Sequence, residues 1–312
     1  MLTLSEIGWP GLGFVFALGL VVGSFLNVVI HRLPRGESVV TPRSHCPACS
    51  APIAAWDNVP LLSYLWLRGR CRGCGAHIAA RYPAVELLTA ALFALTYLLH
   101  SGLTLSLPFD LAFVALVASR GFGLETVLLL GFAGLLIAAA GVDVDHGWIP
   151  DELSLGGLAL GLVAVPAARA AGGEPYGLAL GQSALGAALG AGALWGVGFA
   201  HARLSVALGR SFPHWPGEGE MPPRPASLDY WTWFPGLGFG DVKLIGLVGA
   251  FLGPLGVVYT ILLASLLGLP LGLWLAKSAR HGLAAPFGFA PAIAAAALAV
   301  ATLGPWASRL PL

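Results

Sequence analysis

Apolar runs long enough to cross a membrane alternate with short polar segments along most of the chain. Each long run has roughly the 20 residues that a helix needs to span the hydrocarbon core. The long runs lie at residues 10–30, 83–99, 124–142, 153–171, 178–201, 255–276 and 287–307. A shorter run at 242–252 indicates a further helix, and the run 107–119 is either a half-helix or part of a longer span. The pattern predicts an all-α polytopic membrane protein with about eight transmembrane helices.

The composition agrees with a membrane protein. Hydrophobic residues make up 57% of the 312 positions and charged residues only 10%, whereas a soluble domain carries about 25% charged residues. The net charge is +1, with no basic stripe or tail. We therefore expect the chain to be surrounded by lipid bilayer and to bind no nucleic acid.

The distribution of Lys and Arg predicts how the helices are oriented. Residues 32–82 contain seven arginines and only two acidic residues, so the positive-inside rule places this segment in the cytoplasm and the N-terminus outside. Alternation then puts twelve Lys and Arg residues on the cytoplasmic side and three outside, with the membrane-embedded Lys243 left out. The loops 143–152 and 202–240 fall on the cytoplasmic side.

A polar insert divides the chain. We expect residues 1–31 to form the first transmembrane helix, residues 32–82 a small cytoplasmic insert, and residues 83–312 the membrane body. The loop 211–236 is rich in Pro and Trp. Its aromatic residues suit the membrane–water interface, and a disordered connector is the equal alternative.

All four cysteines lie in the insert, as two Cys-x-x-Cys pairs with 21 residues between them. They are Cys46, Cys49, Cys71 and Cys74. Such pairs can close a tetrahedral thiolate site around Zn²⁺, which is structural because no position stays open. Gly73 and Gly75 offer the loose backbone that a knuckle turn needs. The alternative is disulfides or free thiols, and a cytoplasmic location argues against disulfides.

Two aspartates, about a hundred residues apart, each stand beside a membrane-length apolar segment. Asp143 and Asp241 fall on the same predicted side of the membrane, and ionisable groups at membrane depth are functional candidates. Two carboxylates held together can share one proton and activate water, as in aspartic proteases. Gly238 and Gly240 would allow an unusual backbone and a close approach of substrate. Pro150 should end one helix and start the next. The alternative is that both aspartates merely cap helices.

Other polar residues near these motifs have simpler interpretations. Asp145 points away from Asp143 on a helix, and Asp151 suits the first turn of a helix. His146 is more often a polar loop residue than a proton donor. Lys243 is expected to extend along apolar surface to the cytoplasmic face. Glu86 needs a partner inside its span, and either an arginine or backbone group, or the substrate, would supply one.

These and further motifs resemble the prepilin peptidase family, the type IV leader peptidases, which are GxGD-class intramembrane aspartic proteases. The resemblance covers most of the chain, in the family's order. The matching segments are Gly23–Val28, the cysteine insert, Asp57–Tyr64, Gly69–Arg72, Tyr82–Glu86, Asp143–Asp151, Gly238–Leu244 and Pro286–Gly288.

The resemblance implies a bifunctional enzyme of the bacterial inner membrane. By position, Asp143 and Asp241 match the catalytic aspartates, and the four cysteines match those of the N-terminal methyltransferase-type domain. The substrates would be type IV prepilins or the pseudopilins of type II protein secretion, cleaved after a glycine at the cytoplasmic face. The new N-terminus would then be methylated with S-adenosylmethionine. No soluble-type nucleotide-binding fingerprint is present, so the methyl-donor site does not follow from the sequence.

Functions of other classes stay open. A transporter would also carry acidic residues in glycine-broken helices, but the spans show no internal repeat. A scaffold that binds a partner through its zinc module would tolerate mutation of both aspartates.

Overall fold

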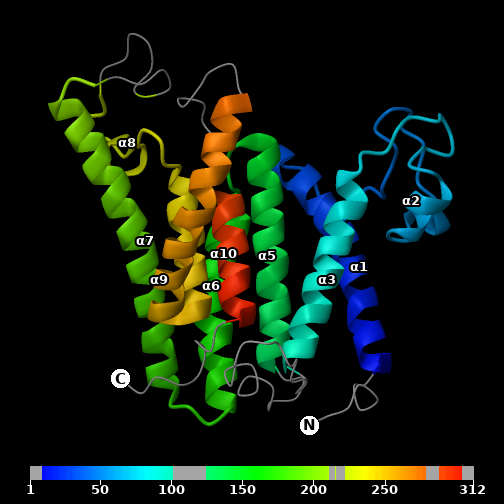
Figure 1. The fold of residues 1–312 in the computed structure, drawn as a ribbon, viewed down its shortest axis with the longest axis horizontal. Helices are drawn as coiled ribbons and strands as arrows, with labels where there is room; N and C mark the ends of the chain where they lie inside the picture. The colour runs from blue at the N-terminus through cyan, green and yellow to red at the C-terminus, as the bar shows by residue number, and fades with distance from the viewer. Residues whose placement is uncertain (1–8, 101–123, 211–214, 216–221, 279–287, 304–312) are drawn as a thin grey trace. The chain divides into compact units, whose positions relative to one another are not determined.

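The structure is a computed structural model that describes residues 9–100, 124–210, 215, 222–278 and 288–303. Within these residues the chain is helical, and its only β-type pairings are three isolated bridges. The longer helices are α1 (Trp9–Arg32), α3 (Arg81–His100), α5 (Leu124–His146), α6 (Asp151–Ala171), α7 (Tyr176–Ala207), α9 (Phe239–Ser278) and α10 (Ala290–Leu303). The short ones are η2 (Leu33–Arg35), η3 (Ala55–Asn58), α2 (Leu62–Trp66) and α8 (Asp229–Thr232). Figure 1 shows these elements along the chain.

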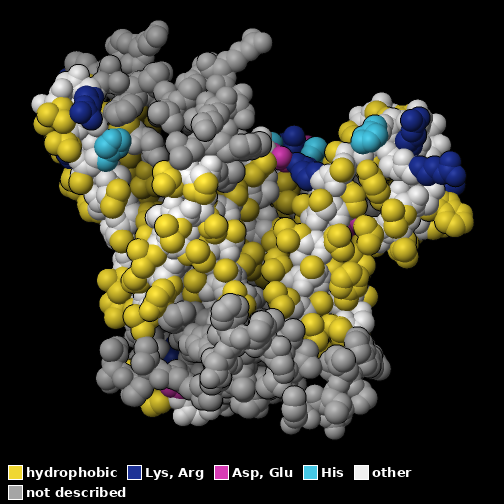
Figure 2. Space-filling model, viewed as in Figure 1, with side chains coloured by type: hydrophobic (Ala, Val, Ile, Leu, Met, Phe, Trp, Pro, Cys, Tyr) yellow, Lys and Arg dark blue, Asp and Glu magenta, His cyan; other side chains and the backbone are white. Residues whose placement is uncertain are grey.

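The prediction of an all-α membrane protein is confirmed. Five described helices are long and apolar enough to cross a membrane. They contain residues of α1, α5, α6, α7 and α9. Hydrophobic side chains cover the flanks of the helices (Figure 2), as lipid contact requires. The count of eight stays a prediction, and the run 107–119 lies outside the described residues.

The chain forms two compact units, residues 1–142 and residues 143–312. The first unit contains α1, the cysteine insert, α3 and most of α5. Small residues bring α1 and α3 together. A Cβ added to Gly19 would lie 2.5 Å from the Ala90 Cα, and one added to Gly23 would lie 2.6 Å from the Glu86 Cα. Glycine therefore permits backbone contact between the two helices that flank the insert.

In the second unit, the predicted helices 242–252 and 255–276 are two arms of α9. Gly253 separates the arms, with φ 71° and ψ −174°, a conformation that a residue with a side chain rarely adopts. Pro254 follows and has no N–H to continue the helical hydrogen bonds. Together these two residues explain why the sequence shows two apolar runs, 242–252 and 255–276, where the structure has one kinked element.

The two arms of α9 lie against the same part of α7. A Cβ added to Gly190 would lie 2.8 Å from the Ile245 carbonyl oxygen and 2.7 Å from Val257 Cγ2. In a straight helix Ile245 and Val257 would be about 18 Å apart. The chain therefore turns back at the kink, as the yellow and orange arms in Figure 1 show. A Cβ on Gly186 or Gly249 would collide with the other residue's backbone.

An aromatic cluster holds the described part of the loop before α9 against α7. The Trp231 ring stacks on Phe199, with centroids 5.4 Å apart, and Phe199 stacks on Trp195 at 5.0 Å. Trp215 is fully buried, and its indole N–H donates to the Trp233 carbonyl at 3.1 Å. These described residues are packed against the protein, so this part of the loop is not a disordered connector, and its location at the membrane–water interface stays a prediction.

Candidate active site

Asp143 is held at the end of α5, next to the start of α10. Its side chain is only 6% exposed. The backbone N–H of Ala290, the first residue of α10, donates to Asp143 Oδ2 at 3.2 Å. This places the carboxylate at the positive end of a helix dipole. A Cβ added to Gly288 would collide with the same carboxylate, so glycine at this position makes room for Asp143.

Asp241 stands in the first turn of α9 and is 7% exposed. Its backbone N–H donates to the Gly238 carbonyl at 3.1 Å, which closes a turn before the helix. Gly240 lies against Ile149, because a Cβ added there would be 3.4 Å from the Ile149 Cβ. The loop after α5 and the start of α9 are therefore in contact. Asp143 lies in the last turns of α5, just before that loop, and Asp241 in the first turn of α9.

The two carboxylates are brought together within the second unit. They are close enough for the charge of Asp143 to act on Asp241. Two carboxylates buried side by side favour a state in which they share one proton. Such a pair can accept a proton from a water molecule with one oxygen and donate a proton with another.

The expected role of the two motif glycines is only partly right. Neither Gly238 nor Gly240 has a positive φ, so the unusual backbone predicted at these positions is wrong. Positive φ occurs instead at Gly236, two residues earlier, and at Gly147 after α5. A Cβ on Gly240 would lie 3.4 Å from the Ile149 Cβ, and one on Gly238 would lie 3.4 Å from Asp241 Oδ2. Both are ordinary contact distances, so both glycines border the site without being required for space.

Lys243 and Pro150 both act on the start of α6. Pro150 is the residue before α6, and its carbonyl accepts hydrogen bonds from the first turn, so the predicted helix break is confirmed. Lys243 was expected to extend to the cytoplasmic surface. Its side chain is instead 19% exposed and forms an ion pair with Asp151. The Lys243–Asp151 ion pair links the first turn of α9 to the first turn of α6.

Glu86 belongs to the first unit and connects α3 with the cysteine insert. It is buried, and its Oε2 accepts a hydrogen bond from the backbone N–H of Leu61 at 2.7 Å. Leu61 has an unusual φ of 59°. Of the partners considered from the sequence, the backbone group is the one found. Glu86 therefore positions the segment of the insert that precedes α2.

The four cysteines form a candidate metal centre in the insert. Their Sγ atoms all lie within 4.8 Å of one another, and Cys46 and Cys74 are 3.9 Å apart. A tetrahedral zinc site with Zn–S bonds of about 2.3 Å requires sulfur atoms about 3.8 Å apart. The donor set therefore fits Zn²⁺ in number, chemistry and spacing. Among the described residues no histidine joins this group.

The two Cys-x-x-Cys turns have the same backbone design. Cys46 N–H donates to the Ala51 carbonyl at 2.9 Å, and Cys71 N–H donates to the Ala76 carbonyl at 2.8 Å. The residue after each second cysteine has positive φ, 57° at Ser50 and 71° at Gly75. Gly75 therefore has the expected role, whereas Gly73 has no positive φ.

Hydrogen bonds at this centre favour the thiolate form of Cys71 over its thiol form. Backbone N–H groups of Cys74 and Gly73 lower the pKa of Cys71 to about 7. At Cys74 a backbone N–H of Ala76 lowers the pKa, but burial and the neighbouring thiols outweigh it and raise the value to about 11. A bound cation would compensate the charge that four thiolates accumulate.

Family models and characterised relatives match both units. Residues 17–100 match the bacterial peptidase A24 N-terminal domain, and residues 129–273 match the type IV leader peptidase family. The prepilin leader peptidase/N-methyltransferase of Aeromonas hydrophila is 34% identical over 92% of this chain and 89% of its own length. That of Myxococcus xanthus is 36% identical over 86% of this chain and 64% of its own length.

A relative with a different name shows the same similarity. The type 4 prepilin-like proteins leader peptide-processing enzyme of Escherichia coli O78:H11 is 33% identical over 80% of both chains. No solved structure matches the chain.

Proposed function

Because this chain belongs to the type IV leader peptidase family, we propose that it is a membrane aspartic endopeptidase that removes the leader peptide of type IV prepilins or pseudopilins. The relatives' names also include N-methyltransferase, and we extend this second activity to the chain. The enzyme would methylate the N-terminus that cleavage creates.

The peptidase proposal depends on one observation, the meeting of two buried carboxylates at the ends of α5 and α9. Asp143 and Asp241 hold a water molecule between them. One carboxylate takes a proton from the water as it attacks the scissile carbonyl, and the other protonates the leaving amine. A coupled pair titrates jointly, so the two roles belong to the pair.

The surroundings of the dyad support these roles. The Ala290 N–H orients Asp143 from one side, and the turn closed by Asp241 N–H fixes the second carboxylate. Gly240, the residue before Asp241, lies against the apolar side chain of Ile149, and both carboxylates are buried. Rigid, water-poor surroundings of this kind strengthen electrostatic interactions at a reacting group.

The cysteine centre would hold a structural Zn²⁺. Cys46, Cys49, Cys71 and Cys74 would fill all four positions, which leaves none for a hydrolytic water. Zinc would close residues 32–82 as a small domain between the first helix, residues 1–31, and the peptidase body, residues 83–312.

S-adenosylmethionine, when bound, would supply the methyl group, whose carbon–sulfur bond breaks as the substrate amine attacks and loses a proton. The chain's own task is then to bind the methyl donor and the new N-terminus close together.

The proposed location is the inner membrane of a bacterium, with the N-terminus outside. The insert, Asp143 and Asp241 would all face the cytoplasm, as the distribution of Lys and Arg predicts. The basic leader of the prepilin would lie on the same side. A transporter or a zinc-module scaffold remains the competing proposal, and both of these predict that the aspartates tolerate substitution.

Mass spectrometry of a prepilin-like substrate tests the proposal. The purified protein is incubated with the substrate and S-adenosylmethionine, beside the Asp241→Asn variant. We expect a mass loss the size of the leader that vanishes in the variant, and a further gain of about 14 Da for methylation. Lack of cleavage of several substrates by a folded, zinc-loaded protein would favour the transporter or scaffold.

A further inference from the structure

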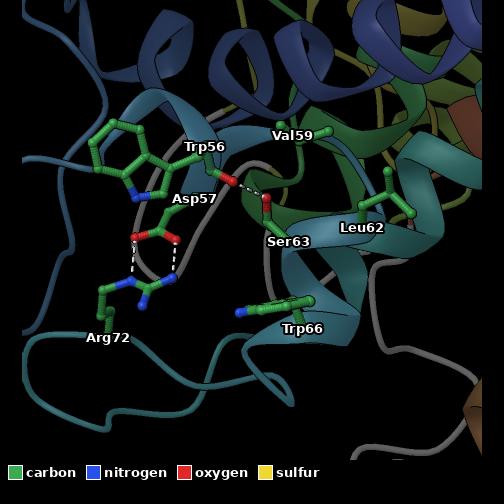
Figure 3. A pocket seen from close by; sticks show the side chains of 7 residues that line it. All are labelled: Trp56, Asp57, Val59, Leu62, Ser63, Trp66 and Arg72. Atoms are coloured by element: carbon green, nitrogen blue, oxygen red, sulfur yellow. Dashed lines mark hydrogen bonds and ion pairs between the residues drawn. The ribbon is translucent and has the colours of Figure 1, made fainter.

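The insert contains an open cleft of about 430 Å³, next to the cysteine centre. This volume lies within the range of about 300–1,000 Å³ that small-ligand sites occupy. The lining residues are Trp56, Asp57, Val59, Leu62, Ser63, Trp66 and Arg72. Figure 3 shows the paired side chains of Asp57 and Arg72 on one side, with the ring of Trp66 across from them. All these residues belong to the first unit, whereas Asp143 and Asp241 belong to the second.

Two tryptophan rings of the cleft are unusually exposed. Trp56 is 72% exposed and Trp66 is 82% exposed. A folded domain normally buries most of an indole ring, and exposed apolar clusters usually mark a binding site. Val59 and Leu62 extend this apolar surface, at 41% and 64% exposure. The cleft therefore presents flat aromatic faces that nothing among the described residues covers.

A bidentate ion pair supplies the polar side of the cleft. Arg72 donates from Nε and Nη2 to the two carboxylate oxygens of Asp57, at 2.8 and 2.7 Å. Within the described part of the chain, no hydrogen bond engages Arg72 Nη1. Ser63 donates to the Trp56 carbonyl at 3.0 Å and can still accept a hydrogen bond.

We propose that this cleft is the binding site for S-adenosylmethionine. The adenine ring would stack on an indole face, and the sulfonium cation would lie against aromatic rings. The carboxylate of the methionine part would bind Arg72 Nη1. The Asp57 carboxylate retains lone pairs that can accept hydrogen bonds from ribose hydroxyls. This inference rests on the methyltransferase part of the proposed function and names the site at which that activity binds its methyl donor.

The cleft also explains why a methyl-donor site would need the metal centre and Glu86. Arg72 lies within the second Cys-x-x-Cys turn, between Cys71 and Cys74. The hydrogen bond from Leu61 to Glu86 fixes the other wall, between η3 and α2. Zinc would thus set the position of Arg72 relative to Asp57, while Glu86 would set the position of the segment that carries Val59 and Leu62.

Binding of S-adenosylmethionine is measured directly by equilibrium dialysis with the radiolabelled compound. The protein is the full chain in lipid nanodiscs, as wild type and as Trp66→Ala, Arg72→Lys and Trp56→Phe variants. Leu65→Ala and Arg70→Ala are the matched controls, because both side chains are exposed in the same segment and neither lines the cleft. Zinc content and leader cleavage verify that each variant is folded.

We expect Trp66→Ala and Arg72→Lys to raise the Kd for S-adenosylmethionine by about tenfold or more, with both controls near wild type. Unchanged binding in both variants would overturn the proposal. A Trp66→Ala variant that contacts lipid less but binds S-adenosylmethionine as the wild type does would also overturn it, and would assign the exposed rings to the membrane surface. Wild-type protein that cleaves leaders but does not bind S-adenosylmethionine would refute the methyltransferase activity itself and leave the peptidase intact.

Photolabelling provides a test that needs no variant. An azido-adenine analogue of S-adenosylmethionine is irradiated with the wild-type protein, and the labelled peptide is identified by mass spectrometry. The expected label falls within residues 56–72. A label confined to another segment, and displaced by unlabelled S-adenosylmethionine, would show that the methyl donor binds elsewhere.

Discussion

The cysteine centre and the aspartate dyad are assembled in opposite ways. The four cysteines lie within residues 46–74, in two local turns of one short insert, and their sulfur atoms lie within 4.8 Å of one another. Asp143 and Asp241 are about a hundred residues apart and are buried at 6% and 7% exposure. Their meeting requires distant segments of the second unit, including α6, α9 and α10, to be packed correctly.

This difference predicts how each site responds to damage. Loss of zinc should disorder the insert, whose turns have little apolar core to replace the metal. The dyad depends on helix packing in the second unit, whereas the cysteines belong to the first unit. Each site can therefore be broken separately, and the following changes are ordered from the largest expected effect to the smallest.

Asp143→Asn or Asp241→Asn should reduce leader cleavage by about 1,000-fold or more, because general acid–base catalysis contributes 10²–10⁴-fold. Zinc content should stay at the wild-type level. Single-turnover cleavage followed by mass spectrometry measures the effect, with Asp145→Asn as the exposed control. Near-normal cleavage by either variant would eliminate the dyad.

Gly288→Ala should reduce cleavage by about 100-fold, because the added Cβ collides with the Asp143 carboxylate and displacement by about 1 Å has this cost. Gly156→Ala is the matched control, since a Cβ there has nothing within 4 Å. Initial rates of both variants are compared in the same membrane preparation. Equal rates would mean that Gly288 does not define the position of Asp143.

Cys46→Ser, or removal of zinc by a chelator, should abolish methylation but leave leader cleavage within about tenfold of wild type. The physical reason is that a closed thiolate site stabilises the insert and performs no hydrolysis. Metal analysis, limited proteolysis of residues 32–82 and the two activity assays are performed together. Complete loss of cleavage with an intact insert would contradict the separation of the two sites.

Lys243→Met should change cleavage by only a fewfold. The ion pair with Asp151 is partly exposed, with side-chain exposures of 19% and 62%, and such pairs contribute about 0–1 kcal/mol. The double variant with Asp151→Asn should resemble the single variants, because both lose the same interaction. A loss as large as that of Asp241→Asn would instead place Lys243 at the reacting atoms.

The sequence predicted each site to a different extent, for physical reasons. Spacing alone indicated the cysteine centre, because a Cys-x-x-Cys turn forms locally. Pairing of the aspartates followed from counting spans, but the contact of Asp143 with Gly288 and Ala290 joins residues about 145 positions apart, which no periodicity encodes. Gly253 and Pro254 are visible as a break in an apolar run, yet only the contacts with α7 show that the chain turns back there.

Two side-chain interactions could not be inferred from the sequence. The partner of Lys243 is Asp151, 92 positions away, and one partner of Glu86 is the backbone N–H of Leu61 in the insert. The cleft between Trp56, Trp66 and Arg72 likewise needs three-dimensional positions, since its residues show no known nucleotide-binding pattern. Long-range hydrogen bonds and clefts are therefore the features that the structure adds.

The most direct test of the account is methylation of a substrate that has already been cleaved. A pseudopilin with its mature N-terminus is incubated with S-adenosylmethionine and either wild-type or Asp241→Asn protein, and the gain of about 14 Da is followed by mass spectrometry. The account predicts equal methylation by both proteins, together with complete loss of leader cleavage by the variant. Loss of both activities in a folded, zinc-loaded Asp241→Asn protein would contradict it.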